Sequence, residues 1–447
     1  MKTETRFKPT EIGMIPEDWE VEKIDNLYDI SSGLSKPRNE FGFGYPFLSF
    51  KNIFDNFSLP EELHELVNST EKERKDCSIT RGDVFLTRTS ETIGELGMSS
   101  VALKNYENAT FNGFAKRLRP KRKDIILPEF AVYLFRSSKI RSQILTFSSL
   151  TTRASLNAGM IKEIKVIIPS PPEQSAIVNI LSPLDNRIDL NRQTNATLEA
   201  IGQALFKHWF MEFEFPNEKG KPYKSSGRKM VDSEFGEIPE GWRVGKIEDI
   251  ASDEKNAIVD GPFGTQMKVK EYQEEGIPVI EMEYLEGYPF YKPFKHFISE
   301  AKFQEVKRSS VKKGDIVISK TGTLGLLGIM TDIYDKAVLV SRLAKITIDE
   351  KKISRYYLFL LLKRLSFEKY WDHISSGSTM PIINLTHIKS KEILIPNEDI
   401  LNKFEALMSS FYATIHNNLK EVQNLFRLRD SLLPKLMSGQ LRAGMGK

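Results

Sequence analysis

The sequence predicts an α+β protein in which one domain of mixed strands and helices occurs twice, and two observations support this prediction. Two long stretches carry apolar residues in alternating steps of four and three, which is typical of a helix that pairs with another helix. A series of short landmark sequences precedes each stretch in the same order. We therefore expect two similar domains separated by two long helices, which pair within the chain as an antiparallel coiled coil with an approximate twofold axis.

The first helical stretch follows Pro169-Ser170-Pro171-Pro172, and proline at this point favours the start of a helix. At about 1.5 Å per residue, the stretch would form a rod of roughly 60 Å. A helix of that length with polar residues on both sides of a narrow apolar stripe needs a partner helix. The stripe consists of Ile177, Leu181, Leu184, Ile188, Asn191, Asn195, Leu198, Gly202, Leu205 and Trp209.

The second helical stretch supplies a partner within the same chain. A constant shift along the sequence carries the stripe onto mostly apolar positions between Phe404 and Leu436. The same shift carries Asn191 onto Asn418, and a buried Asn in such a stripe lowers stability but fixes the pairing register. We predict that Asn191 and Asn418 hold the register, so that replacing both with Leu raises the melting temperature or permits mispaired oligomers. The alternative is two unrelated surface helices that share a period by chance.

The landmarks ahead of each helix define the repeated domain. Gly82-Asp83 and Gly314-Asp315 each predict a turn, followed by a buried strand that ends in a basic residue and Thr. The shift between copies differs from landmark to landmark, which indicates loop insertions within a shared fold. The other matched pairs are residues 15–19 with 238–242, Phe114-Ala115-Lys116 with Leu343-Ala344-Lys345, the helical runs 128–146 with 354–370, and 148–169 with 375–396.

These landmarks set the expected boundaries along the chain. Residues 217–229 are rich in Lys, Gly and Ser and predict an exposed linker. We expect a first domain at 1–172, a first long helix at 173–214, a linker at 215–235, a second domain at 236–397 and a second long helix at 398–447.

The composition is that of a water-soluble globular protein. The chain has 447 residues, of which 40% are hydrophobic, and no apolar run is long enough to cross a bilayer. Its single cysteine, Cys77, excludes an internal disulfide and a cysteine-based zinc site. The first residues lack the apolar core of a secretion signal, so we expect a cytoplasmic protein. The net charge of +4 is too small to indicate nucleic-acid binding by itself.

The sequence contains no convincing active site. The only Pro-Pro, Pro171-Pro172, lacks the flanking residues of a DNA amino-methyltransferase motif, and no phosphate-binding Gly-Lys-Ser/Thr loop is present. The six histidines show no metal-ligand spacing. Glu163-Ile164-Lys165 has the Glu-x-Lys pattern of some nucleases, but this tripeptide is common and the second copy lacks it. We expect neither catalysis nor a metal or cofactor on this chain.

Residues suited to DNA binding are grouped in loops of both domains. Residues 117–123 and 307–313 are rich in cations that could contact phosphates, although each could equally be a solvated surface loop. Forked and amide side chains on loops could read base edges. The candidates are Lys36, Arg38, Asn39, Lys51, Arg88, Thr89 and Arg117 in the first domain, and Thr265, Gln266, Lys268, Lys320, Thr321 and Arg342 in the second.

Several short motifs lie in an order that is repeated along the chain: residues 16–19, 239–242 and 261–265, Gly82-Asp83, Gly314-Asp315, Pro169 with Pro172-Glu173-Gln174, and 436–441. With these motifs in view, the whole chain resembles the specificity (HsdS) subunit of type I restriction-modification systems. Each motif is weakly specific alone, but their order is repeated. The second helix start, residues 396–400, departs from the family pattern, and we expect a looser helix start there.

The resemblance implies a division of labour among subunits. Each target-recognition domain would read one half of a bipartite double-stranded DNA target, and the paired helices would set the spacer and dock two methyltransferase subunits. Two restriction motor-nuclease subunits would join them. S-adenosylmethionine, ATP and Mg²⁺ would be bound by these partners. The alternatives are a single-chain restriction enzyme or nuclease with its own active site, and a coiled-coil scaffold that does not bind DNA.

Overall fold

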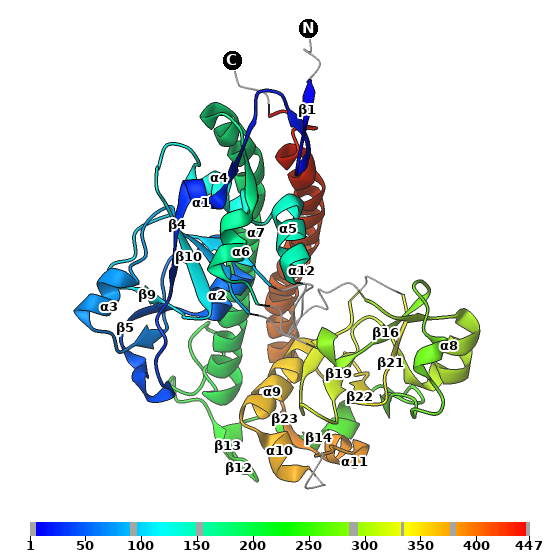
Figure 1. Cartoon of the computed structure of the whole chain (residues 1–447). Coiled ribbons are helices and arrows are strands. Elements are labelled where there is room, and N and C mark those ends of the chain that lie inside the picture. Colours follow the sequence, from blue (N-terminus) through cyan, green and yellow to red (C-terminus); the bar gives the residue numbers. More distant parts are fainter. Residues whose placement is uncertain are drawn as a thin grey trace. The chain divides into compact units, whose positions relative to one another are not determined.

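The computed structural model describes residues 6–89, 96–148, 155–285, 294–331, 335–375 and 381–443. The chain divides into two compact units: Met1–Ile188 with Asn424–Lys447 (unit 1), and Asp189–Gln423 (unit 2). Each unit contains one predicted domain and a segment of each long helix (Figure 1). None of the described helices combines the length and apolarity that a membrane span requires.

Unit 1 is built on a four-stranded antiparallel sheet in the order β4-β10-β7-β8. Its sheet strands are β4 (Tyr28–Ser32), β7 (Val84–Thr87), β8 (Ser99–Val101) and β10 (Ala115–Pro120). The other strands are β1 (Phe7–Thr10), β2 (Gly13–Pro16), β3 (Glu20–Lys23), β5 (Phe41–Leu48), β6 (Leu66–Val67), β9 (Thr110–Phe111) and β11 (Lys165–Ile168). The helices are α1 (Ile24–Leu27), η1 (Arg38–Glu40), α2 (Phe50–Asp55), α3 (Glu71–Asp76), α4 (Pro128–Leu134), α5 (Ser138–Ser148) and α6 (Ala158–Glu163).

Unit 2 repeats this architecture, with its main sheet in the order β15-β22-β19-β20. The strands of that sheet are β15 (Ile258–Asp260), β19 (Ile316–Ser319), β20 (Leu327–Ile329) and β22 (Leu343–Ile346). The others are β12 (Met230–Ser233), β13 (Gly236–Pro239), β14 (Arg243–Lys246), β16 (Ile277–Ile280), β17 (Phe297–Ile298), β18 (Ser310–Val311), β21 (Ala337–Leu339) and β23 (Glu392–Ile395). The helices are η4 (Ile247–Ile250), η5 (Val269–Glu271), η6 (Met282–Tyr284), α8 (Glu300–Val306), η7 (Lys307–Ser309), α9 (Arg355–Phe367), α10 (Tyr370–Ile374) and α11 (Leu385–Lys389). The predicted α+β fold with two similar domains is confirmed.

One of the two inner strands of each main sheet, β7 or β19, is buried on both faces, which explains its largely apolar sequence. In β7, Val84 lies in one core with Phe130, whereas Phe85 points to the other face and contacts Phe111 with ring centroids 5.1 Å apart. In β19, Ile316 and Ile318 likewise enter one core and Val317 enters another. The Gly-Asp motifs thus begin the strand on which both layers of each domain pack.

The strand register corrects one of the matches made from the sequence. Ala115 pairs with Thr87 in unit 1, and the residue paired with the equivalent Ser319 in unit 2 is Leu343. Phe114 therefore corresponds to Arg342, not to Leu343 as the sequence match has it. The difference matters because a shift of one residue moves every side chain to the opposite face of a strand.

The helices after the sheet also repeat, including their N-caps. Asn157 accepts a hydrogen bond from the Met160 N–H at 2.9 Å, and Asn384 accepts one from the His387 N–H at 2.8 Å. Each of these caps satisfies a backbone donor that the first turn of a helix leaves open. The runs predicted at 128–146 and 354–370 are each interrupted, giving α4 and α5 in unit 1 and α9 and α10 in unit 2.

The long helices are α7 (Pro171–Phe206, continued by the π-helical turn η3, Lys207–Met211) and α12 (Glu398–Met437). In unit 2, Asn195 of α7 contacts Asn418 while Phe206, further along α7, lies 6.4 Å from Phe404 between ring centroids. Residue numbers increase along α7 in the direction in which they decrease along α12. The predicted antiparallel pairing is therefore confirmed. In unit 1, the corresponding segments carry a 3.0 Å ion pair between Asp185 and Arg429.

The two asparagines predicted to hold the register do not contact each other. Asn191 is 3% exposed, and its Nδ2 donates to Glu421 Oε2 at 3.0 Å. Asn418 Nδ2 donates instead to Asn195 Oδ1 at 2.8 Å. Their role in register stays a prediction, but the two asparagines of the stripe that contact each other are Asn195 and Asn418.

The ends of both long helices differ from the expected boundaries. The predicted linker includes β12, which pairs with β13 as β1 pairs with β2. The start of α12 is capped rather than loose, since Asn397 Oδ1 accepts from the Ile400 N–H at 3.2 Å. The helix ends at Met437, and Gly439 (φ +72°) lies so close to Pro16 that a Cβ there would be 2.2 Å from its Cγ.

The residues after α12 close onto the first domain through Arg442. Its guanidinium donates to both oxygens of Asp18, at 3.0 and 2.7 Å, and to both oxygens of Glu173, at 2.6 and 2.8 Å. Glu173 is 4% exposed and also accepts from Trp19 Nε1 at 2.7 Å. The sequence shift that relates the two apolar stripes makes Phe215 of unit 2 equivalent to Arg442. The Phe215 ring stacks on Trp242 with ring centroids 5.3 Å apart.

We predict that Arg442→Gln lowers the free energy of unfolding by roughly 2 kcal/mol, because buried Glu173 loses charge-assisted hydrogen bonds. The Arg442 hydrogen bond lowers the pKa of Asp18 below its usual 3.8. The stability that the Asp18–Arg442 ion pair contributes is therefore present above about pH 4 and is lost as the pH falls below that value. Urea unfolding at pH 7 and pH 3 measures both effects. Lys435→Gln, an exposed charge-matched change on α12, should leave stability within about 0.5 kcal/mol; an equal loss in both variants would contradict the assignment.

We predict that Asn418→Leu and Asn195→Leu each destabilise the protein by about 1–2 kcal/mol, because each leaves its partner amide unpaired. The double variant should recover most of this loss or exceed the wild type, since an apolar pair replaces a polar one. Thermal unfolding of the four proteins gives the coupling energy. Asn417→Leu, at an exposed neighbouring position, is the control. Additive losses in the double variant would count against a paired amide contact.

Candidate nucleic-acid interface

The end of β7 in unit 1 presents the predicted residue Arg88 to solvent. The Arg88 N–H donates to the Phe114 carbonyl at 2.8 Å, and the Leu156 N–H donates to the Arg88 carbonyl at 2.8 Å. Its backbone is therefore held between two other segments while the side chain is exposed. Thr89 is half-buried and bridges to Ser155. We call Ser32, Arg88, Phe114 and Lys116 the strand-end site of unit 1.

The same backbone arrangement occurs at the end of β19 in unit 2. The Lys320 N–H donates to the Arg342 carbonyl at 2.8 Å, and the Ile383 N–H donates to the Lys320 carbonyl at 2.9 Å. Thr321 bridges to Ile382 as Thr89 bridges to Ser155. By strand register, the strand-end site of unit 2 consists of Asp260, Lys320, Arg342 and Ala344.

A glycine brings a loop against each strand-end site. A Cβ on Gly33 would lie 2.3 Å from the Asn112 carbonyl oxygen, and one on Gly261 would lie 2.0 Å from that of Val340. Only glycine permits so close a backbone approach. The loops that follow carry most of the remaining predicted DNA-binding residues.

Those loop residues differ in how free their side chains are. Lys36 forms a 2.8 Å ion pair with Glu73, whereas Arg38 and Asn39 are exposed in η1. In unit 2, Thr265, Gln266 and Lys268 are exposed, and Gln266 Oε1 accepts from the Phe263 N–H at 3.1 Å. Phe263 is itself 64% exposed and was not among the predicted residues.

The cations of the two strand-end sites have different surroundings. In unit 1, Lys116 donates to Ser32 Oγ at 2.6 Å, and burial together with neighbouring Arg88 lowers the pKa of Lys116. In unit 2, Lys320 is 8% exposed and its ammonium lies 2.9 Å from Asp260 Oδ2. Burial opposes the ionisation of Asp260, but Lys320 and Arg308 outweigh it and lower the Asp260 pKa. Lys320 thus serves an internal ion pair.

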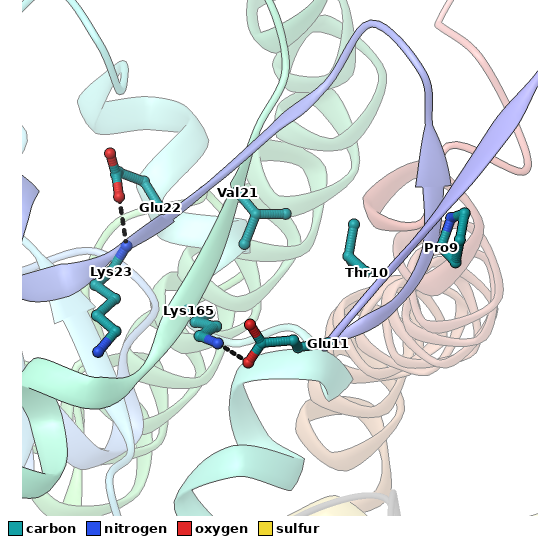
Figure 2. A pocket seen from close by; sticks show the side chains of 7 residues that line it. All are labelled: Pro9, Thr10, Glu11, Val21, Glu22, Lys23 and Lys165. Atoms are coloured by element: carbon teal, nitrogen blue, oxygen red, sulfur yellow. Dashed lines mark hydrogen bonds and ion pairs between the residues drawn. The ribbon is translucent and has the colours of Figure 1, made fainter.

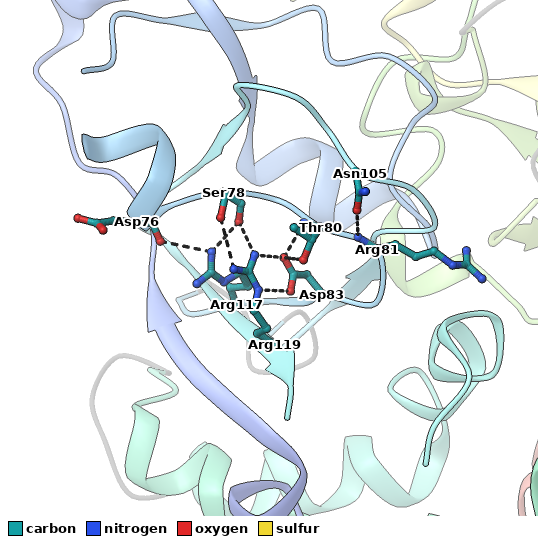
Figure 3. A network of polar contacts seen from close by, with 8 residues as sticks. All are labelled: Asp76, Ser78, Thr80, Arg81, Asp83, Asn105, Arg117 and Arg119. Atoms are coloured by element: carbon teal, nitrogen blue, oxygen red, sulfur yellow. Dashed lines mark hydrogen bonds and ion pairs between the residues drawn. The ribbon is translucent and has the colours of Figure 1, made fainter. Parts of the chain in front are cut away.

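Arg117 is a structural residue, which corrects its prediction as a DNA contact. It is 7% exposed, and its guanidinium donates to the carbonyls of Asp76 and Ser78 at 3.3 and 2.6 Å (Figure 3). The adjacent Arg119 donates to both oxygens of Asp83, at 2.8 and 2.6 Å. In unit 2, Asp315 accepts instead from Lys345 at 3.3 Å and Thr347 at 2.6 Å. Arg119 therefore stabilises the Gly-Asp turn and Arg117 the segment that precedes it, whereas Lys121, Arg122 and Lys123 of the same basic run are exposed.

Lys51 lies in surroundings that oppose DNA binding. It lines a hollow of about 660 Å³ together with Asp55, Glu61, Glu62 and Glu65. Four carboxylates around one lysine repel a phosphate backbone. Lys51 is therefore not suited to the nucleic-acid interface for which it was predicted.

The described residues provide no catalytic arrangement. A hollow of about 780 Å³ beside β1 is lined by Glu11, Lys165 and five further residues, with Glu11 and Lys165 in an ion pair (Figure 2). Glu163 of the Glu-x-Lys tripeptide is engaged with Lys23 at 2.7 Å. No group of three His, Cys, Asp or Glu residues suited to a metal ion occurs in the described ranges.

Sequence reasoning missed the exposed aromatic residues and Lys116. Phe114 is 61% exposed, and Phe41, Phe43 and Tyr45 are exposed along β5, where the Arg74 guanidinium lies 3.7 Å from the Tyr45 ring centroid. The alternation of aromatic residues and glycine in Phe41-Gly42-Phe43-Gly44-Tyr45 was a usable signal. Lys116 had none, because its neighbour Arg88 is distant in sequence.

Known proteins resemble this chain over nearly its whole length. The MjaIX type I restriction enzyme specificity subunit of Methanocaldococcus jannaschii is 29% identical over 98% of this chain and 97% of its own length. The HindI specificity subunit of Haemophilus influenzae is 24% identical over 95% and 100%. The crystal structure of an S subunit of a type I restriction-modification system from M. genitalium covers 94% of this chain and 96% of its own, with a TM-score of 0.53 and 16% identity, and so shares the fold.

The family model for the type I restriction modification DNA specificity domain matches residues 16–200 and 239–424, once in each repeat. These ranges begin at the two Pro-Glu-x-Trp landmarks and extend into the long helices. The resemblance drawn from the motifs is confirmed. The chain belongs to the type I restriction modification DNA specificity family, and it is a non-catalytic specificity subunit.

Proposed function

We propose that this chain is the sequence-specific double-stranded DNA-binding subunit of a type I restriction-modification complex, in which each domain reads one half of a bipartite target. One observation carries the proposal: the same construction of strand end, glycine-held loop and exposed polar side chains occurs once in each domain. A protein that reads two half-sites needs such a surface twice, and the loops can differ while the scaffold stays the same.

Base reading belongs to the exposed loop residues of each domain. The forked, amide or hydroxyl groups that discriminate base edges are carried by Arg38 and Asn39 in unit 1 and by Thr265 and Gln266 in unit 2. Exposed Lys268 supplies charge beside them, whereas Lys36 is held by its ion pair with Glu73. The side chains of Arg117 and Lys320 support the scaffold.

The paired helices set the length of DNA between the half-sites and dock two methyltransferase subunits. Four apolar side chains of α7 and α12 are 41–52% exposed and offer apolar contact surface to such a partner. Two restriction motor-nuclease subunits complete the assembly, and the partners carry S-adenosylmethionine, ATP and Mg²⁺. The four side chains are Leu190, Ile201, Leu407 and Leu428.

We predict that replacing residues 20–168 with the equivalent segment of a relative changes one half of the target and leaves the other half and the spacer unchanged. Mapping of methylated sites in cells that carry the chain with its partner subunits measures this. A reciprocal exchange of the second domain is the matched control. If one exchange changed both halves of the target, the two domains would not read DNA independently. If the chain shifted no duplex in an electrophoretic mobility assay at any salt concentration, the alternative of a coiled-coil scaffold that does not bind DNA would be favoured.

We predict that inserting one heptad into each long helix, at facing positions near Asn195 and Asn418, lengthens the accepted spacer while the half-sites stay the same. The insertion preserves the stripe that pairs the helices. Seven residues inserted after the exposed Gly220 should leave the spacer unchanged. The same methylation mapping distinguishes the two variants, and an unaltered spacer after the helix insertions would refute this role.

A further inference from the structure

The two strand-end sites occupy the same place in the fold but differ in charge. Strand register makes Arg88 equivalent to Lys320 and Lys116 equivalent to Ala344. It also makes Ser32, which pairs with Lys116, equivalent to Asp260, which pairs with Ala344. The carboxylate of unit 2 is therefore replaced by a hydroxyl in unit 1, and a second cation is added beside it.

In unit 1 the two cations lie together without an opposing charge. Lys116 is hydrogen-bonded to neutral Ser32. Lys116 pairs with Leu86 and the Arg88 N–H donates to the Phe114 carbonyl, so Arg88 and Lys116 are diagonal neighbours on the same face of two paired chain segments. No ion pair joins either side chain to a carboxylate within the described ranges. Keeping like charges together at a partly buried position is unfavourable unless an anion binds between them.

In unit 2 the equivalent cation is already neutralised. Asp260 contacts Lys320 at 2.9 Å and Arg308 at 2.7 Å, and its side chain is only 17% exposed. Lys320 is thus unavailable to a ligand. The exposed cation at this site is instead Arg342, which replaces Phe114 at the neighbouring position.

We infer that the two domains grip the DNA backbone through different residues at one shared position: Arg88 and Lys116 bind a phosphate in the first domain, and Arg342 does so in the second. This inference rests on the proposed function and adds to it the residues and the chemical group they take. A phosphodiester suits the site because its oxygens accept from both the Arg fork and the Lys ammonium. Such contacts position the protein without reading sequence.

Ser32→Asp tests the inference by giving unit 1 the carboxylate of unit 2. The new charge should neutralise the Lys116 and Arg88 pair, so the affinity for a duplex carrying the mapped target should fall about five- to tenfold. The slope of log affinity against log salt should become about one unit shallower. Ser32→Asn, which keeps an acceptor but adds no charge, is the matched control and should bind as the wild type does.

Arg88→Gln and Arg342→Gln provide a second measurement at exposed positions. Each should make the salt slope about one unit shallower, and neither should alter the methylated sequence. Lys320→Gln should lower the melting temperature and leave the salt slope unchanged, because it breaks an internal ion pair. Filter binding with the full chain and its methyltransferase subunits gives the slopes, and circular dichroism checks folding.

The outcomes separate the inference from the function on which it rests. Failure of the wild-type complex to bind the duplex would overturn the proposed function itself. Normal wild-type binding, with Ser32→Asp matching Ser32→Asn and Arg88→Gln matching the wild type, would overturn the inference alone. A shallower slope in Lys320→Gln would reassign the contact of the second domain to Lys320.

Discussion

The fold depends on the burial of each domain against a pair of antiparallel helix segments from distant parts of the chain. In unit 1, Leu181 of α7 and Leu436 of α12 lie in one core with Phe130 of the domain. In unit 2, Phe206 of α7 and Phe404 of α12 lie in one core with Tyr357. Because burial of apolar surface is the dominant favourable contribution to folding, neither domain core is complete without both helices.

The strands and loops gain their positions from this core. A central strand buried on both faces has no freedom to slide, since a shift of one residue would expose its apolar side chains. The polar residue that follows the strand, Arg88 or Lys320, is therefore presented at a fixed place. The two domains differ in the side chains around the strand end, where Ser32 of unit 1 occupies the position that Asp260 occupies in unit 2.

Much of the architecture was predictable from the sequence because it rests on periodic patterns. The stripe spacing, the repeated landmarks and the proline-marked helix start predict two domains and two paired helices, and the structure and the family match agree. The DNA-binding residues were less predictable. Arg117 and Lys320 are basic residues beside strands in the sequence, yet partners far along the chain bury them. Lys51 carries charge suited to DNA, but nearby carboxylates surround it.

By itself, the sequence determined the repeat, the heptad stripe, the strand-forming runs and the absence of motifs for catalysis, because each depends on residues close together in the chain. The tertiary structure decided which cations are free, which asparagines pair, and which residues are equivalent between domains. Those questions depend on neighbours brought together by folding, such as Lys116 beside Arg88 or Asn195 beside Asn418. Electrostatic interactions and hydrogen bonds act over a few ångströms in space, and no pattern along one chain records that distance.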